Sequence, residues 1–516
     1  MLGERDPQRR LFGTLAELGV DRVKRMGFYG RLALKGSSLF KDEDFADVYC
    51  RDNGRPSTPP SILALARLLQ HYDGISDAEV VERCRYDLRY KAVLDLDLSN
   101  VDAPFAKSTY QAFRARLTLH AKEGLAFERS VELARQEGLL PSRLRVALDS
   151  SPVRGRGAVK DTFCLLSDAI AAVIRAVARK QGTQAEQVAT GAGLERHIEA
   201  ASLKGSEVVD WNSHDAVGEF LAGLVQDCGR AVVLAEEADC AAAETELLKR
   251  VLEQDVESGD GEGGVRIRRG VAKDRMPSVA DPDMRHGRKS SGTRYDGHKA
   301  HVAVEESSGV VTAVDVGAPG EADGAKVSDL IEQTKHTTGC EVEGALGDCA
   351  YGTSEARSQA AECGIELRTK MPGPPAGRFG PGAFTLSRDR MQATCPAGHP
   401  SEKQSKCRDG VLHVWSPSVC EQCPLKARCT KAAKRQLLAR PDFHERRQRE
   451  EYARSAEGRA VLRRRVVVEH TIGRVKNLGA GTARYFGRAK TRAQWMWTAA
   501  VANLSLVWNQ PEGDAA

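Results

Sequence analysis

The sequence predicts an α/β protein in which a mixed sheet is flanked by helices. An all-helical N-terminal domain, a helical insertion and a small cysteine-rich insertion complete the predicted architecture. Three observations lead to this fold class. The first third of the chain repeats apolar residues at helical spacing, the part after residue 295 contains short alternating segments typical of strands, and five of the thirteen cysteines fall between Cys395 and Cys429.

Length and composition limit the class of protein. The chain has 516 residues, enough for about three folding units. Hydrophobic residues at 41% and charged residues at 28% are ordinary globular usage and exclude a mostly disordered or collagen-like chain. We expect no membrane span, because no apolar run reaches about eighteen residues. The first residues contain acids and a proline, unlike a signal peptide, so we expect a cytoplasmic protein.

The net charge of +5 hides a strong asymmetry along the chain. Residues 426–492 hold 20 Lys plus Arg against 6 Asp plus Glu, a balance of +14, so the other residues sum to −9. A short run of this kind is usually a solvated helix face. An excess over 67 residues indicates instead a segment that meets phosphates.

Helical periodicity predicts the N-terminal domain over residues 1–135. Pro59 and Pro60 open one of its helices and Gly74 closes it, because proline fits the first helical turn and glycine the left-handed end of a helix. Ser76, followed by an acid three residues later, has the spacing of a capping box that begins the next helix.

The first part of the sheet domain is predicted over residues 136–371. A strand over residues 144–149 alternates apolar side chains and stops at an acid. Apolar residues at helical spacing then return, so we assign residues 161–292 to a helical insertion, within which residues 258–264 read as a glycine-rich linker.

Strand and helix patterns alternate after the insertion. Ser307-Ser308-Gly309 separates two β-branched segments and predicts a hairpin, and a further strand over residues 342–347 is followed by an acid. Residues 372–450 form the cysteine-rich insertion. Residues 451–510 return to the sheet domain as helices, the first of them a long basic helix over residues 453–478.

Three acids on unlike elements are the candidate catalytic residues. Asp149 and Asp348 each terminate a predicted strand, and acids at neighbouring strand ends can converge at one edge of a sheet. Glu469 lies in the basic helix among valines, where a carboxylate is costly to bury unless it is paired or bound to metal. For a single strand-end aspartate the alternative is a turn or cap residue.

The blocks around these acids resemble those of bacterial insertion-sequence transposases of the DDE class. The motifs are ALDSSPV at residues 147–153, GDCAYG at residues 347–352 and Arg465-x3-Glu469-x6-Lys476, supported by YDGHK at residues 295–299. The resemblance covers most of the chain and implies an RNase H-like core in which the three acids are the catalytic triad. Many members carry a tyrosine three residues before the arginine, where this sequence has Leu462, so no DNA contact is carried over to that position.

The resemblance also implies a metal-dependent reaction on DNA. Asp149, Asp348 and Glu469 would hold two Mg²⁺ ions, or Mn²⁺, roughly 3.5 to 4 Å apart, which stabilise the attacking and leaving oxygens of a phosphodiester. Arg465 and Lys476 would clamp the DNA backbone, and His298 and Lys299 would hold a phosphate near the same edge. Solvent-exposed helix charge and a surface loop are the respective alternatives for these two pairs.

The cysteine cluster predicts a structural zinc site. Cys420, Cys423 and Cys429 place three thiolates within ten residues and Cys395 offers a fourth, a set that suits a closed tetrahedral Zn²⁺ site. Cys407 and His399 are spare candidates, and the alternative is a set of unmetallated thiols. A closed site leaves no position for water, so this zinc is predicted to fold the insertion and not to catalyse.

The expected function is therefore a DNA transposase that cleaves at the ends of its element and joins them to target DNA. It would bind terminal inverted repeats and work as a homodimer or larger assembly, because two ends are joined. When bound to DNA it would associate with the bacterial nucleoid. The helical N-terminal domain would recognise ends, dimerise, or both. Two alternatives stay open at this point: an RNase H-like nuclease without strand transfer, and a catalytically inactive zinc-containing DNA-binding protein.

Overall fold

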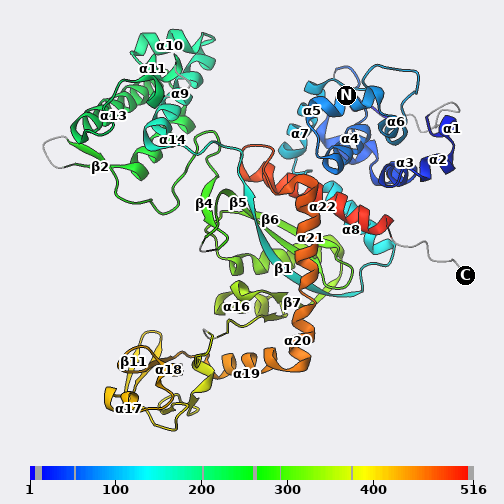
Figure 1. The fold of residues 1–516 in the computed structure, drawn as a ribbon. Helices are drawn as coiled ribbons and strands as arrows, with labels where there is room; N and C mark the ends of the chain where they lie inside the picture. Colours follow the sequence, from blue (N-terminus) through cyan, green and yellow to red (C-terminus); the bar gives the residue numbers. More distant parts are fainter. Residues whose placement is uncertain are drawn as a thin grey trace, which may run out of the picture.

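The computed structural model describes residues 1–5, 14–50, 54–199, 203–259, 264–290, 292–373 and 376–509. Figure 1 shows a central sheet region from which three lobes extend: the N-terminal helices, the helical insertion and the cysteine-rich segment. Within these ranges, none of the helices combines the length and the apolar character that a membrane crossing needs.

The N-terminal region is helical, as predicted. Its elements are α1 (Thr14–Leu18), α2 (Val20–Lys24), α3 (Phe28–Leu39), the 3₁₀ helix η1 (Asp42–Val48), α4 (Pro60–Asp73), α5 (Asp77–Tyr86), α6 (Leu88–Leu94), α7 (Lys107–Leu119) and α8 (Leu125–Gln136). α4 ends at Gly74, whose φ of 70° is left-handed, and the Ser76 hydroxyl accepts the Glu79 N–H at 3.2 Å to cap α5. Both helix boundaries confirm the sequence signals.

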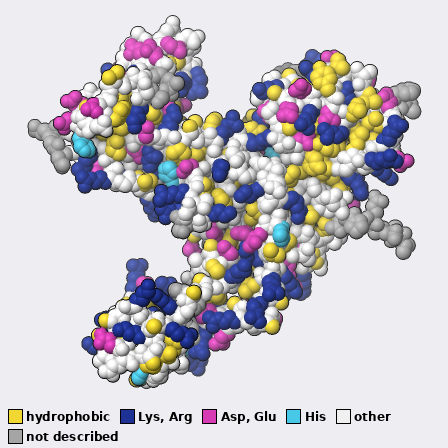
Figure 2. Space-filling model, viewed as in Figure 1, with side chains coloured by type: hydrophobic (Ala, Val, Ile, Leu, Met, Phe, Trp, Pro, Cys, Tyr) yellow, Lys and Arg dark blue, Asp and Glu magenta, His cyan; other side chains and the backbone are white. Residues whose placement is uncertain are grey.

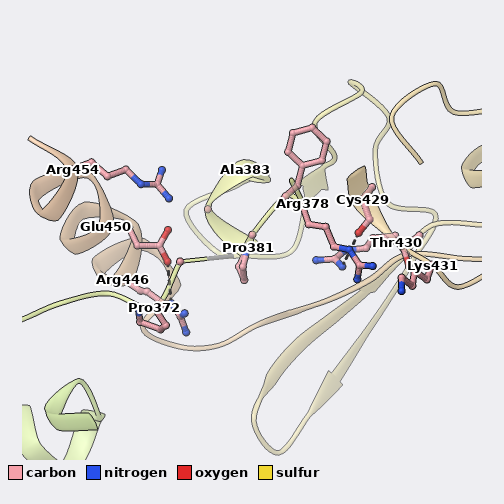
Figure 3. Close-up of a pocket in the computed structure, with 15 residues that line it drawn as sticks. Pro372, Arg378, Pro381, Ala383, Cys429, Thr430, Lys431, Arg446, Glu450 and Arg454 are labelled. Atoms are coloured by element: carbon pink, nitrogen blue, oxygen red, sulfur yellow. Dashed lines mark hydrogen bonds and ion pairs between the residues drawn. The ribbon is translucent and has the colours of Figure 1, made fainter. Parts of the chain in front are cut away.

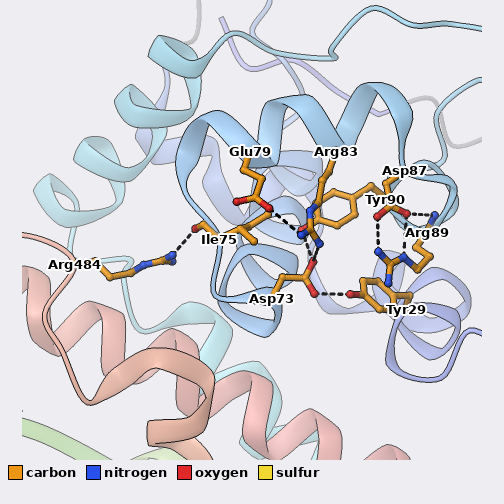
Figure 4. Close-up of polar contacts among 9 residues, drawn as sticks. All are labelled: Tyr29, Asp73, Ile75, Glu79, Arg83, Asp87, Arg89, Tyr90 and Arg484. Carbon is orange, nitrogen blue, oxygen red and sulfur yellow. Dashed lines mark hydrogen bonds and ion pairs between the residues drawn. The ribbon is translucent and has the colours of Figure 1, made fainter.

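A polar network ties these helices together around Asp73. Its carboxylate accepts hydrogen bonds from Tyr90 Oη at 2.7 Å and from Arg83 Nη1 at 2.8 Å, and also from Tyr29 Oη (Figure 4). Arg484, from the C-terminal part of the chain, donates to the backbone carbonyl of Ile75. The N-terminal helices are thus attached to the rest of the molecule, and their apolar residues share one hydrophobic core with the last helix of the chain.

The central sheet contains β1 (Arg143–Arg154), β4 (Arg285–Arg288), β5 (Arg294–Glu305), β6 (Val311–Gly317), β7 (Glu341–Gly347) and β8 (Glu366–Thr369). The strand order is β4-β5-β1-β7-β8, and β6 also pairs with β5. β1 is antiparallel to β5 and parallel to β7, and β7 is parallel to β8. The sheet is therefore mixed, as predicted.

Helices cover both faces of this sheet. Val146 and Leu148 of β1 pack in one core with the 3₁₀ helix η2 (Asp323–Lys326) nearby and with α15 (Val327–Thr338) and α16 (Ser354–Glu362). Ala147 and Val153, on the opposite face, pack in the core that contains α21 (Val466–Val475) and α22 (Arg488–Trp508). Successive side chains of a strand point to opposite faces, so Asp149 lies on the face covered by α21.

The helical insertion leaves the sheet between β1 and β4. It contains α9 (Thr162–Gln181), α10 (Ala185–Ala192), α11 (Arg196–Glu199), α12 (Leu203–Ser206), α13 (His214–Glu237), α14 (Ala242–Asp255), and a hairpin of β2 (Val256–Ser258) and β3 (Val265–Ile267). It has a hydrophobic core of its own. The predicted linker falls at this hairpin, and its residues 260–263 lie outside the described residues.

The cysteine-rich lobe follows β8. It contains the 3₁₀ helix η4 (Pro381–Ala383), β9 (Thr385–Leu386), β10 (Ala393–Thr394), β11 (Lys403–Cys407), β12 (Gly410–Val414), α17 (Pro417–Glu421), α18 (Lys426–Cys429) and β13 (Gln436–Ala439). Phe384, Trp415 and Phe443 centre a small core. The lobe stands apart from the sheet in Figure 1 and connects to it through α19 (Phe443–Arg454).

The predicted single basic helix over residues 453–478 is wrong in one respect. α19 ends at Arg454 and α20 (Ala456–Arg463) begins after Ser455, whose backbone is extended and whose hydroxyl accepts the Gly458 N–H at 2.9 Å. A Cβ at Gly458 would lie 1.9 Å from the Tyr452 carbonyl oxygen, so this tight turn needs glycine. From α20 the chain continues through α21 into a short π-helical turn over Lys476–Ala480.

Candidate active site

One cavity brings the three predicted acids together. Asp149 from β1, Asp348 from the end of β7 and Glu469 from α21 all line a cavity of about 610 Å³. Its other walls include Arg465, Lys476, Lys299 and the turn that joins β4 to β5. The structure therefore places the carboxylates in one site, while their catalytic role stays a prediction.

Strand pairing explains how the two aspartates meet. The prediction that the first strand stops at Asp149 is wrong, because β1 continues to Arg154 by pairing with β5. Pairing with β7, however, ends at Ala147 opposite Leu346, so the sheet opens beside Asp149 where β7 turns away at Asp348. The aspartates thus lie at the point where two parallel neighbours diverge, the usual position of a ligand site in α/β sheets.

Asp348 also caps a turn. Its Oδ1 accepts the Ala350 N–H at 2.8 Å at the start of the 3₁₀ helix η3 (Cys349–Tyr351). The cap interpretation considered for a strand-end aspartate therefore holds for one oxygen of Asp348. The same residue lines the cavity, so the structural role and a ligand role are compatible.

Arg465 lies between two of the acids. Its Nη1 is 3.0 Å from Asp149 Oδ2, and its Nη2 forms an ion pair with Glu469 Oε1. The Arg465 side chain is only 7% exposed, whereas that of Glu469 is 50% exposed. The Arg465 guanidinium is thus buried and engaged by carboxylates, and its expected contact with the DNA backbone stays a prediction.

Burial sets the electrostatics of Asp149. Desolvation raises the pKa of its carboxyl group, and the negative charge of Asp348 acts in the same direction. The Ser150 N–H at 2.8 Å and the Arg465 guanidinium oppose this shift of the pKa. A partly buried carboxylate of this kind needs a cation, and here Arg465 supplies it.

A basic rim surrounds the acids. Lys476 lines the cavity, and burial together with the charges of Lys289 and Arg154 lowers its pKa. Lys299 also lines the cavity, but its ammonium group is held by Asp323 at 3.2 Å. Sequence reasoning missed Arg288 and Lys289 in the wall; the signal was the basic run that precedes the predicted hairpin.

Two further residues named in the sequence analysis are buried. His298 has no exposed surface, and its Nε2 lies 3.4 Å from Oδ2 of the equally buried Asp281. The alternating pattern of β5 turns this residue away from the cavity, and the phosphate contact expected of His298 stays a prediction. Leu462, at the position that many family members fill with tyrosine, is buried.

The cysteines gather at a second, much smaller cavity. Cys395, Cys420, Cys423, Cys429 and His399 line a space of about 20 Å³, the size of one atom. Burial raises the pKa of Cys429; the other three thiols act in the same direction and Arg435 in the opposite one. Cys407 is exposed on β11 and does not line this space.

Neither site is preformed for a metal. Among the residues that the structure describes, no group of three or more His, Cys, Asp or Glu side chains is placed to hold a metal ion. The donor types do fit, with oxygens suited to Mg²⁺ in the large cavity and thiols suited to Zn²⁺ in the small one. In the large cavity a metal ion would compete with Arg465 for the carboxylates of Asp149 and Glu469.

A mixed sheet that presents three carboxylates inside a basic rim indicates a protein that acts on phosphate-bearing molecules. Comparison with known families is more definite. The family model described as Transposase domain (DUF772) matches residues 34–116, and the one described as Transposase DDE domain matches residues 394–508. Together these matches support a DDE-class transposase of insertion-sequence type and indicate a role in DNA transposition.

The second of these matches reaches the site and the first does not. The second begins inside the cysteine-rich lobe and includes Arg465 and Glu469, whereas neither match reaches Asp149 or Asp348. Searches of curated proteins and of solved structures gave no significant match.

Proposed function

We propose that the protein cleaves DNA at the ends of its element and transfers the freed strands to target DNA, with Asp149, Asp348 and Glu469 as the catalytic residues. The observation that carries this proposal is the convergence of these acids, from β1, β7 and α21, on one cavity. The strand order supports an RNase H-like core: β6, β5 and β1 are antiparallel neighbours, and β7 and β8 then follow parallel to β1.

The acids would hold two Mg²⁺ ions, which supply charge stabilisation on the attacking and leaving oxygens. Asp149 and Glu469 would give up their contacts with Arg465 and bind Mg²⁺ instead. Lys476, with Arg288 and Lys289 of the same cavity, would bind the phosphates that flank the scissile bond. Lys299 would hold Asp323 in place at the same edge.

The thiols of Cys395, Cys420, Cys423 and Cys429 would hold one structural Zn²⁺, with His399 as the remaining candidate at the same cavity. Because two DNA ends must be joined, the active form would be a homodimer or a larger assembly on two terminal inverted repeats. The helical N-terminal region would recognise the ends or form the contact between copies.

Glu469→Gln tests the proposal. Binding to a duplex that carries the borders of the gene should stay within about twofold of the native protein. Cleavage in Mg²⁺ should fall at least about 100-fold, because losing a metal ligand removes several kcal/mol of transition-state stabilisation. Glu457→Gln is the matched control, since Glu457 is exposed on α20 and does not line the cavity.

The products separate the alternatives. Joined DNA supports transposition, whereas cut DNA without joined product supports a nuclease that lacks strand transfer. Binding without cleavage by the native protein in Mg²⁺ or Mn²⁺ supports an inactive DNA-binding protein. Native-level cleavage by Glu469→Gln would remove Glu469 from the catalytic set.

A further inference from the structure

A second large cavity lies outside the acidic site, where the cysteine-rich lobe meets α19. Its volume is about 550 Å³. Figure 3 shows Arg446, Glu450 and Arg454 of α19 on one wall and Arg378 and Lys431 on the other. We call this space the basic cleft.

The charges of the basic cleft are strongly unbalanced. Five cations line it, namely Arg378, Lys431, Arg435, Arg446 and Arg454, against the single acid Glu450. Glu450 is buried and already accepts Arg446 Nε at 3.2 Å. Within the described ranges, Arg378, Lys431 and Arg454 form no ion pair, so the cleft has unpaired positive charge.

This surplus does not simply follow from an arginine-rich helix. The opposite side of α19 borders another cavity, of about 480 Å³, which is also lined by arginines. There two of the three arginines are paired: Arg449 with Asp442 at 3.1 Å and Glu445 at 3.4 Å, and Arg368 with Glu366 at 2.9 Å. The third, Arg357, donates to the Gly352 carbonyl at 3.0 Å. Among the described lining residues, the cleft therefore has the larger excess of positive charge, five cations against one acid compared with three against two, and this excess favours an anionic ligand.

The described lining of the basic cleft suits the phosphates of a DNA backbone better than the bases. Gly373, Gly380 and Gly382 line it beside the basic side chains. A Cβ at Gly382 would lie 2.5 Å from Glu450 Oε2, which fixes this loop close to α19. The one aromatic ring in the wall, Phe379, is covered by the Arg428 guanidinium at 4.7 Å, so it is not free to stack on a base.

We propose that the basic cleft binds the phosphodiester backbone of the DNA on which the acidic site acts. Figure 2 shows Lys and Arg side chains on the cysteine-rich lobe and along the helices that join it to the core. Arg454 precedes Glu469 by fifteen residues, and only Ser455 between them is extended. Their Cα atoms therefore lie at most about 27 Å apart. One duplex can reach both sites, with the cleft contacting phosphates within about eight base pairs of the cut.

The proposal rests on the proposed function only in naming DNA as ligand, and salt dependence of binding tests it directly. The probe is a fluorescein-labelled 40-base-pair duplex of arbitrary sequence, bound to the full chain without added Mg²⁺. Each lost phosphate contact lowers the slope of log K against log salt by about 0.9. The triple variant R378A/K431A/R454A should lose about 2 to 3 units of slope and bind at least about tenfold more weakly at 0.1 M salt.

The matched control is K403A/R408A/R447A. It removes the same charge from the same two parts of the chain, at residues that do not line the cleft. An equal loss of slope in both triple variants, or no loss in either, overturns the proposal. R378K/K431R/R454K should restore the slope, which excludes a folding defect as the cause.

Inorganic phosphate distinguishes a free anion from DNA. In one outcome, phosphate at constant ionic strength raises the Tm of the native chain but not that of R378A/K431A/R454A, while the triple variant keeps the native slope for DNA binding. The cleft would then bind a small anion, and the proposal would be overturned. Glu469→Gln should leave the slope unchanged. If the native protein never cleaves DNA, but R378A/K431A/R454A still lowers the slope, the proposed function is refuted and DNA binding by the basic cleft is supported.

Discussion

Arg465 controls the charge balance of the acidic cavity. It is buried, and it contacts both Asp149 and Glu469, whose charges would otherwise face each other without a cation. In the proposed reaction Mg²⁺ competes for the same oxygens. The arginine would then stabilise the metal-free site and be displaced when metal and DNA bind.

Arg465→Met should therefore change stability and metal response together. Without metal, the variant should lose about 2 kcal/mol of unfolding free energy, because two carboxylates lose their cation; the partial exposure of Glu469 keeps the loss below that of a fully buried pair. Added Mg²⁺ should raise the Tm of the variant more than that of the native protein. Arg463→Met, at an exposed position of α20, is the control; an equal Mg²⁺ response in all three proteins would contradict the competition.

His301 gives a pH dependence with a definite sign. It is fully buried on β5, and neither ring nitrogen has a partner within the described part of the chain. Burial lowers its pKa to about 4; Asp315 on β6 and Asp323 on η2 oppose the shift, whereas Lys299 and Lys326 favour it. Since the folded state disfavours protonation, this contribution to stability is present above pH 6.5 and is lost as pH falls toward 4.

The loss should reach about 3 kcal/mol in denaturant unfolding measured from pH 7 to pH 4. His301→Leu removes the titrating group and should flatten this part of the curve. His120→Leu, at an exposed position, should retain the native pH dependence. Parallel curves for the native protein and His301→Leu would assign the acid loss to other groups.

At the scale of elements, the sequence predicts most of the sheet because its signals are local. Alternation and glycine turns correctly place the β5–β6 hairpin, and Asp348 directly follows β7 as expected. Two boundaries depend on tertiary pairing instead. β1 runs past Asp149 and through Pro152 because β5 pairs with it along that length, and α19 and α20 separate at Ser455 because the chain must turn from the cysteine-rich lobe to the sheet.

The candidate site was predictable to a similar extent. The three acids could be predicted from the sequence because each lies in a recognisable motif. The position of Arg465 between two of them could not be predicted. Helical spacing places Arg465 one turn from Glu469, but only the docking of α21 against β1 brings it to Asp149. The burial of His298 likewise depends on Asp281, seventeen residues away in the chain.

At the scale of the whole molecule, the cysteine-rich lobe and the basic cleft form one structural unit. Cys429, Thr430 and Arg435 line both the thiol cavity and the cleft. Arg435 Nη1 donates to the Cys429 carbonyl at 3.2 Å, so the segment that carries the thiol also places the cleft cations. A metal that holds the thiols in place would therefore also hold in place the wall of the basic cleft that contains Thr430 and Arg435.

Cys423→Ser combined with Cys429→Ser tests this coupling. The native protein should contain about one zinc per chain by metal analysis, and the double variant should contain none, because a closed structural site needs its thiolates. The variant should also lose slope in the salt dependence of DNA binding, as R378A/K431A/R454A does, while α15, α16 and the sheet keep their protection from hydrogen exchange. Cys407→Ser, outside the thiol cavity, should retain both zinc and slope. A fully folded native protein that contains no zinc would refute the zinc site. A zinc-free double variant that keeps the native slope would show that DNA binding by the cleft does not depend on the thiols.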